Sequence, residues 1–159
     1  MIKEELAMRG RLNIKMFDRA GKLIGERQNN NKIVSSGREL VARLFEGLSG
    51  ASPISHFSIG TGSSSTSDTA TGLEQIQIIS GTDDQKNVNI TGVSLISGTN
   101  QWKVDVHGVL TMGEANNLAI TEVGLFSMTP YLAMYNRVVF APINKTSAFE
   151  LQFFWEIIF

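Results

Sequence analysis

The chain has 159 residues, of which 42% are hydrophobic and 18% are charged, and its formal net charge is −1. This length suffices to bury a core in one domain, and the absence of cysteine excludes disulfides and thiolate metal sites. The near-neutral charge argues against nucleic-acid binding by bulk electrostatics, and no apolar run reaches the roughly 18 residues of a membrane-spanning helix. Because the N-terminus interleaves acids and bases and does not match a secretory signal, we expect assembly in a cytoplasm.

The first 30 residues predict an N-terminal hairpin. Residues 11–17 alternate between apolar and polar side chains, a turn follows at 18–21, and residues 22–27 form the returning strand. We expect the asparagine run at 29–31 to end this hairpin. Residues 1–30 would then be a docking segment attached to a β-rich structural domain, residues 31–159.

Residues 36–48 are the one segment whose pattern predicts a helix. Ser36 and Glu39 match a capping box at its start, and Gly47 is a typical helix terminator. We expect an amphipathic helix that packs on a sheet through the apolar residues of one side: Leu40, Val41, Leu44, Phe45 and Leu48.

Residues 60–72 form a low-complexity segment of glycine, serine, threonine and aspartate. The segment is too long for a tight turn and predicts a surface loop that is mobile or is ordered only by a partner. Its start, Gly60-Thr61-Gly62, resembles a phosphate-binding loop only superficially, because no Lys-Ser/Thr pair follows and no helix pattern begins there. We therefore expect no cofactor at this loop.

The rest of the chain predicts strand after strand, separated by turn residues. The expected strands are residues 75–80, 88–96, 102–112, 119–128, 132–140 and 148–159. In the third of them, we expect Trp102, Val104 and Val106 to face the core. The predicted fold class is mainly β, an antiparallel β-sandwich or open barrel with one packed amphipathic helix.

The last strand alternates without a gap. One face carries only large apolar residues: Phe149, Leu151, Phe153, Trp155, Ile157 and Phe159. Terminal segments fray unless sheet pairing holds them, so we expect this strand to be central in the sheet. The opposite face mixes polar and apolar residues, and we expect it to meet another protein through Phe154, Glu156 and Ile158.

Candidate catalytic residues are few. His56 and His107 are far apart in the sequence and lack metal-ligand spacing, so we expect locally hydrogen-bonded imidazoles. Glu122 lies within an apolar run, where a carboxylate is costly unless it is paired. Arg137 is the favoured partner and Lys145 the alternative, and a hydrolase that uses Glu122 with His107 is the weakest hypothesis. We predict no catalytic, cofactor-binding or metal-binding residues.

Six short motifs follow one another from about residue 31 to the C-terminus. They are residues 31–37 (NKIVSSG), 59–62 (IGTG), 73–74 (LE), 122–126 (EVGLF), 137–145 (RVVFAPINK) and 153–157 (FFWEI). As an ordered set they resemble a family of bacteriophage tail structural proteins, although no single motif is specific.

The resemblance implies a non-enzymatic virion protein of a phage tail or tail-like contractile particle, at the tail fibre root, baseplate or neck. Its partners would be other tail, baseplate or neck proteins and further copies of itself, with a trimer favoured. Nucleic acid and membrane are not expected as partners. The alternative is a carbohydrate- or ligand-binding β-sandwich that uses Trp102, Trp155, Tyr131 or Tyr135 as stacking platforms.

Overall fold

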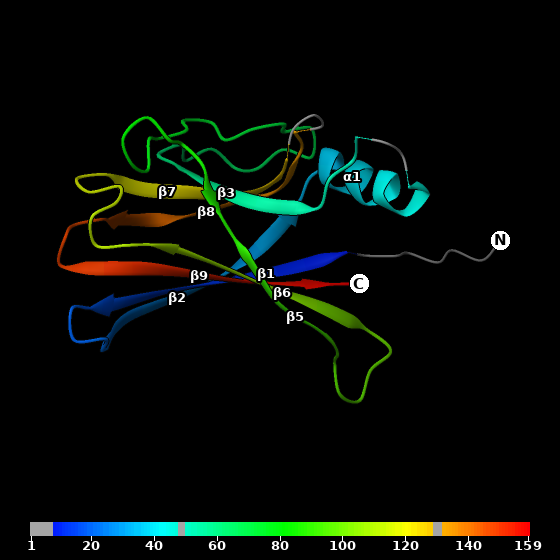
Figure 1. The fold of residues 1–159 in the computed structure, drawn as a ribbon, viewed down its shortest axis with the longest axis horizontal. Coiled ribbons are helices and arrows are strands. Elements are labelled where there is room, and N and C mark those ends of the chain that lie inside the picture. Colours follow the sequence, from blue (N-terminus) through cyan, green and yellow to red (C-terminus); the bar gives the residue numbers. More distant parts are fainter. Residues whose placement is uncertain (1–7, 48–49, 129–131) are drawn as a thin grey trace.

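The computed structural model describes residues 8–47, 50–128 and 132–159, and within them the mainly β prediction is confirmed. Nine strands and one helix occur in these residues (Figure 1). In chain order they are β1 (Arg9–Asp18), β2 (Leu23–Ile33), α1 (Ser35–Glu46), β3 (Ile54–Gly60), β4 (Lys86–Asn87), β5 (Asn89–Leu95), β6 (Trp102–Leu110), β7 (Ala119–Ser127), β8 (Met134–Asn144) and β9 (Phe149–Ile158).

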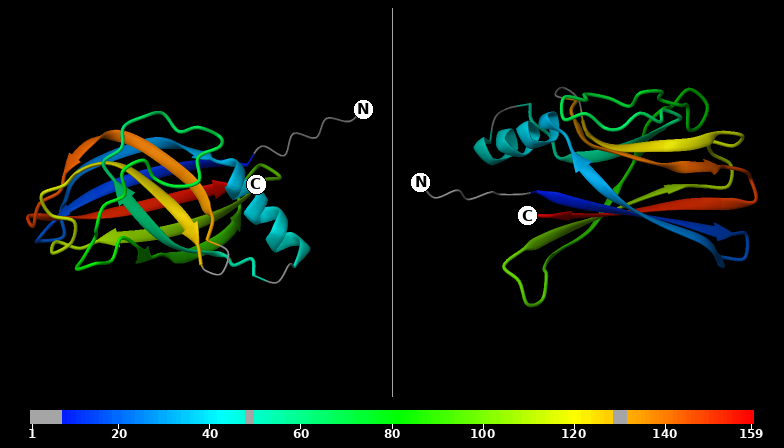
Figure 2. Two further views of the ribbon diagram at one scale, coloured as in Figure 1. Left: turned by 90° about the horizontal axis from the view of Figure 1, so that it is seen from above. Right: turned by 180° about the vertical axis from the view of Figure 1, so that it is seen from behind.

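The strands form one nearly closed, barrel-like antiparallel sheet in the order β4-β3-β7-β8-β2-β1-β9-β6-β5. Strand β2 joins its two halves, because most of β2 pairs with β1 whereas Lys32 and Ile33, at its end, pair with β8. The sheet thereby folds into two facing layers, with α1 at the end of the molecule where β1 begins and β9 ends (Figures 1 and 2).

The main core lies between the two layers. Phe57 on β3 contacts the rings of Phe153 and Trp155 on β9, with centroids 5.5 and 6.0 Å apart. Gly108 on β6 makes this contact possible, because a Cβ there would lie only 2.9 Å from the Phe57 ring. The aromatic residues of the last strand therefore connect the two layers.

Strand β9 is central, as its alternation predicts, because it pairs with β1 on one side and β6 on the other. Leu151, Phe153 and Trp155 are buried on the core face. On the opposite face, the expectation of an exposed Ile158 is wrong, since this side chain is only 5% exposed. Its register neighbours are Arg9 and Lys103, whose aliphatic stems are long enough to cover it.

The N-terminal hairpin is an integral part of the sheet. Strand β1 lies between β2 and β9, and β2 continues through the asparagine run to Ile33. The boundary expected at residue 30 therefore falls inside a strand and marks no break. The asparagines do not end the strand, because the register of β1 and β2 continues through all three of them.

Two other strand predictions need correction. Residues 75–80 are not a strand; they form isolated bridges at Ile76 and Ser80 while their backbone follows β3. Strand β6 ends at Leu110, and Trp102 at its start is 51% exposed and so does not join the core. The start of β6 extends with the end of β5 away from the facing layer, in agreement with this exposure (Figure 1).

The predicted capping box of the helix is wrong, although the helix itself is present. Helix α1 begins at Ser35, and its cap position is Val34, which makes no side-chain cap bond. The Ser36 hydroxyl instead donates to the carbonyl of Met134 on β8 at 2.7 Å. The helix ends at Glu46, and Gly47 follows it as the C-cap with a positive φ of 71°, the left-handed conformation. Leu48 lies outside the described residues.

Candidate functional site

Strand β7 is buried on both faces from Ile120 to Ser127. One face packs in the core between the layers, and the segment from residue 61 to 77 covers the other. A second apolar cluster lies beneath this segment and consists of Val34, Phe126 and Met134, with Ala70 and Leu73 packed against it. The low-complexity segment is therefore a cover for the sheet.

Glu122 lies under this cover and is fully buried. Its Oε1 accepts hydrogen bonds from the backbone amides of Gly62 (3.0 Å) and Gln75 (2.8 Å). Its Oε2 accepts from the Glu74 amide at 3.1 Å and from Arg137 Nε at 2.6 Å. The partner predicted for this acid is thus in contact with it, and four donors compensate the cost of burying the carboxylate.

Arg137 extends the network to the loop. Its Nη1 donates to the Ser64 carbonyl at 3.0 Å, and its Nη2 donates to Glu74 Oε2 at 3.2 Å. Glu74 also accepts from the Ser64 amide and hydroxyl, and the backbone hydrogen bond is the largest cause that lowers the pKa of Glu74. We call Gly62, Ser64, Glu74, Glu122 and Arg137 the clasp.

The Gly-x-Gly sequence of the loop has a structural role in the clasp. A Cβ at Gly60 would lie 2.3 Å from Glu122 Oε1, and one at Gly62 would lie 2.4 Å from the Glu74 Cβ. These two glycines make room for a carboxylate of the chain itself. A bulge between Ile120 and Glu122 lets Thr121 also face the cover, where its hydroxyl donates to the Gly62 carbonyl at 2.7 Å.

The loop at residues 60–72, predicted to be mobile or ordered only by a partner, is instead held by contacts within the chain. Besides the clasp, the Ser35 amide donates to the Asp68 carbonyl at 2.7 Å, and Lys32 pairs with the Asp68 carboxylate at 3.3 Å. Glu122 and Arg137 were predicted from the sequence, whereas the roles of Glu74 and Ser64 were not. The Leu-Glu pair that closes the loop is a sequence feature that indicates Glu74.

The two histidines lie on different layers of the sheet. His56 on β3 is buried, stacks on Phe126 and has Ser55 Oγ 3.0 Å from its Nδ1. His107 on β6 stacks on Phe154 at 4.5 Å, with its Nε2 3.1 Å from Gln152 Oε1. The structure does not bring His107 and Glu122 together, and the contacts of Glu122 commit it to the loop. The hydrolase hypothesis thus has no geometric support.

Burial lowers the pKa of His56, and the nearby Asp84 carboxylate opposes this shift. The folded state therefore binds the imidazole proton more weakly than the unfolded state, whose pKa is about 6.5. We expect the free energy of unfolding to fall as the pH drops below about 6.5, and His56→Gln to reduce this slope. Urea denaturation across this pH range measures the effect, and parallel curves for the two proteins would contradict it.

The outer face of β9 offers less apolar surface than expected. Phe154 is half-buried between the His107 ring and the ammonium group of Lys15, which lies 5.4 Å from its centroid. Glu156 pairs with Lys103 at 3.5 Å. With Ile158 buried, the three residues predicted to form an interface present a largely polar surface.

A different apolar surface opens between α1 and the β5–β6 pair. It is a groove of about 240 Å³, and its lining includes Leu40, Val41, Leu44, Ile90, Val106 and Phe159. The helix residue Phe45 is 95% exposed, and Val93, Leu95 and Trp102 continue the exposed apolar surface along β5 and β6. We call the groove, together with these exposed residues at its edge, the apolar groove. The expectation that Leu44 and Phe45 pack on the sheet is therefore wrong, because nearly all of Phe45 and more than a third of Leu44 are exposed.

The proposed stacking platforms are mostly inaccessible. Trp155 and Tyr135 are 1% and 3% exposed, whereas Trp102 is half exposed at the edge of the apolar groove. Tyr131 lies outside the described residues. Within residues 8–47, 50–128 and 132–159, no three His, Asp or Glu side chains gather into a group that could hold a metal ion. No helix in that part of the chain is long and apolar enough to cross a membrane.

Comparison of the chain with protein-family models, curated proteins and solved structures gives no match.

Proposed function

We propose that this chain is a non-enzymatic assembly module of a phage tail or a tail-like contractile particle, at the tail fibre root, baseplate or neck. The observation that carries the proposal is the clasp. Four of the six motifs of the resemblance contain clasp residues: 59–62, 73–74, 122–126 and 137–145. A fifth motif, residues 31–37, supplies Lys32, which pairs with Asp68 in the loop that the clasp holds. Their polar groups hold the chain's own segments together, which supports a role in defining a fold.

The apolar groove supports assembly as the activity of that fold. Contiguous exposed apolar surface marks protein interfaces, and this groove lies beside the edge strand β5. We propose a second copy of this chain as its occupant, in a closed ring that buries the groove of every subunit. The resemblance favours a trimer, with neighbouring tail, baseplate or neck proteins as further partners.

Replacement of groove residues should dissociate this oligomer. In a Leu44→Ser/Ile90→Ser variant, two lining residues that are 39% and 50% exposed become polar. Light scattering at tens of micromolar should show an oligomer for the unmodified chain and a shift toward monomer for the variant, because each lost apolar contact weakens association.

A Leu23→Ser/Ile24→Ser variant is the matched control, since these residues are 43% and 53% exposed at the hairpin, away from the groove. It should retain the mass of the unmodified chain. A monomeric unmodified chain, or equal dissociation of both variants, would contradict the groove as a self-assembly surface.

A second candidate function is carbohydrate binding, which the exposure of Trp102 favours. Exposed aromatic faces stack on apolar faces of sugar rings. A glycan array tests this candidate, and a hit that Trp102→Ala abolishes would support it over assembly.

A further inference from the structure

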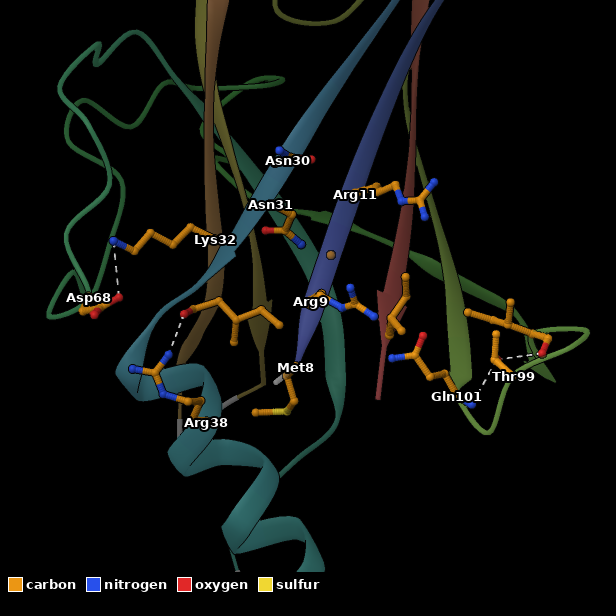
Figure 3. A pocket seen from close by; sticks show the side chains of 14 residues that line it. Met8, Arg9, Arg11, Asn30, Asn31, Lys32, Arg38, Asp68, Thr99 and Gln101 are labelled. Atoms are coloured by element: carbon orange, nitrogen blue, oxygen red, sulfur yellow. Dashed lines mark hydrogen bonds and ion pairs between the residues drawn. The ribbon is translucent and has the colours of Figure 1, made fainter. Parts of the chain in front are cut away.

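Two further concave surfaces of the molecule carry charged side chains mainly of one sign. The larger, about 710 Å³ at the start of β1, is lined by cations such as Arg9 and Arg11 (Figure 3). These two side chains lie on the outer face of the β1–β2 pair, whereas the buried amide of Asn31 lies on its core side, over Gly10. No single ligand can contact both, so we assign no ligand to this surface. The smaller surface has its polar groups on one face of the sheet.

This smaller surface is a pocket of about 380 Å³ beside the edge strand β4. His56 on β3 is the register partner of Asn87 on β4, so both side chains lie on the face opposite Phe57, which points into the core. Lys86, the register partner of Phe57, lies on the core side and pairs there with Glu114. In the described part of the chain, no lysine or arginine lines the pocket.

Two carboxylates without a cationic partner line this pocket. Asp83 and Asp84 form neither an ion pair nor a hydrogen bond through their carboxylates with any described residue. Burial lowers the pKa of His56 and the Asp84 carboxylate opposes this shift, which places Asp84 close to the imidazole. The pocket therefore has a negative charge that no described side chain compensates, and this charge favours a cationic ligand.

His56 adds a buried polar atom that lacks a partner. The side chain lines the pocket and is only 6% exposed, with its ring stacked on Phe126 and Ser55 Oγ 3.0 Å from Nδ1. Nε2, at the far end of the ring from the strand, has no hydrogen-bond partner among the described residues. An unsatisfied buried nitrogen is costly, and a ligand that donates to Nε2 would remove this cost. Because burial keeps the imidazole neutral near neutral pH, one ring nitrogen is able to accept.

We propose that this pocket binds the guanidinium group of an arginine side chain from another polypeptide. The two aspartates accept charge-assisted hydrogen bonds from it. His56 Nε2 accepts a further one, with the ring proton on Nδ1 donated to Ser55 Oγ. Met128 and Leu132, which are 56% and 50% exposed at the pocket, pack on the aliphatic part of the arginine.

The kind of cation follows from the acceptors. They come from a strand and from the turn before β4, and the planar guanidinium carries five donors that reach acceptors in several directions. Free arginine fits less well than an arginine within a polypeptide, because the two aspartates repel its own carboxylate. This inference is independent of the assembly function, since neither the apolar groove nor an oligomer enters the argument.

NMR of the histidine ring nitrogens tests the site, with N-acetyl-arginine amide added at low ionic strength. Saturable binding should shift the ring nitrogens of His56 toward the tautomer protonated at Nδ1. His107, the other histidine of the chain, lies on the opposite layer and should not respond. N-acetyl-citrulline amide, the uncharged isostere, should not bind. An Asp83→Asn/Asp84→Asn variant should bind the arginine probe at least about tenfold more weakly, since two charge-assisted contacts are lost.

Asp18→Asn/Glu26→Gln is the control, because it changes the net charge equally in the β1–β2 hairpin, and neither residue lines the pocket. It should retain the affinity of the unmodified chain. Absence of saturable binding, an equal loss in both variants, equal binding of the citrulline probe, or binding without a response of the His56 ring would overturn the proposal. Tighter binding of free arginine than of the blocked probe would overturn the assignment to an arginine within a polypeptide.

Discussion

Arg137→Met is expected to destabilise the protein by about 3–5 kcal/mol, because it leaves the buried carboxylate of Glu122 without its cation. The variant also loses the bonds from Arg137 to Ser64 and Glu74. Urea denaturation measures the change. Limited proteolysis should also cut the variant at residues 60–72, whereas the clasp should protect this loop in the unmodified chain.

A double-mutant cycle separates the pair from its surroundings. Glu122→Gln should also destabilise, and Glu122→Gln/Arg137→Met should cost less than the sum of the single changes, because the double variant buries no unpaired charge. Arg43→Met is the control, since Arg43 pairs with Glu39 at the surface of α1 and its loss should cost less than about 1 kcal/mol. Additive losses at Glu122 and Arg137 would show that the clasp is not a coupled unit.

Trp155→Ala is expected to cost about 3–5 kcal/mol through loss of buried area and creation of a cavity. Trp155 is 1% exposed and packs against Phe57 and Phe153, and its register neighbours are Leu12 on β1 and Val106 on β6. The loss is a large share of the roughly 5–15 kcal/mol that stabilises a domain. Chemical denaturation followed by circular dichroism measures it.

Phe154→Ala is the control on the same strand. Phe154 faces outward and is only half-buried, so its loss should cost clearly less than that of Trp155. Equal losses at the two positions would contradict the assignment of the inner face of β9 to the main core. They would also remove the argument that β9 connects the two layers.

The sequence by itself determined the features that depend on near neighbours in the chain. Period-two alternation in residues 149–159 was enough to place Trp155 on a core face. An acid inside an apolar run had to be paired, and Arg137 was within reach on the next strand. Gly47 ended the helix because glycine adopts a positive φ without strain.

Only the tertiary structure decided what covers each face. Alternation shows that a strand has two faces, but it does not say that residues 61–77 lie over β7 or that Trp102 is half exposed. Ser36 matched a cap in sequence, yet a carbonyl of β8 was closer to its hydroxyl. The apolar groove likewise depends on segments distant in the sequence. Such contacts are set by how the sheet closes, and local residue patterns carry no information about that closure.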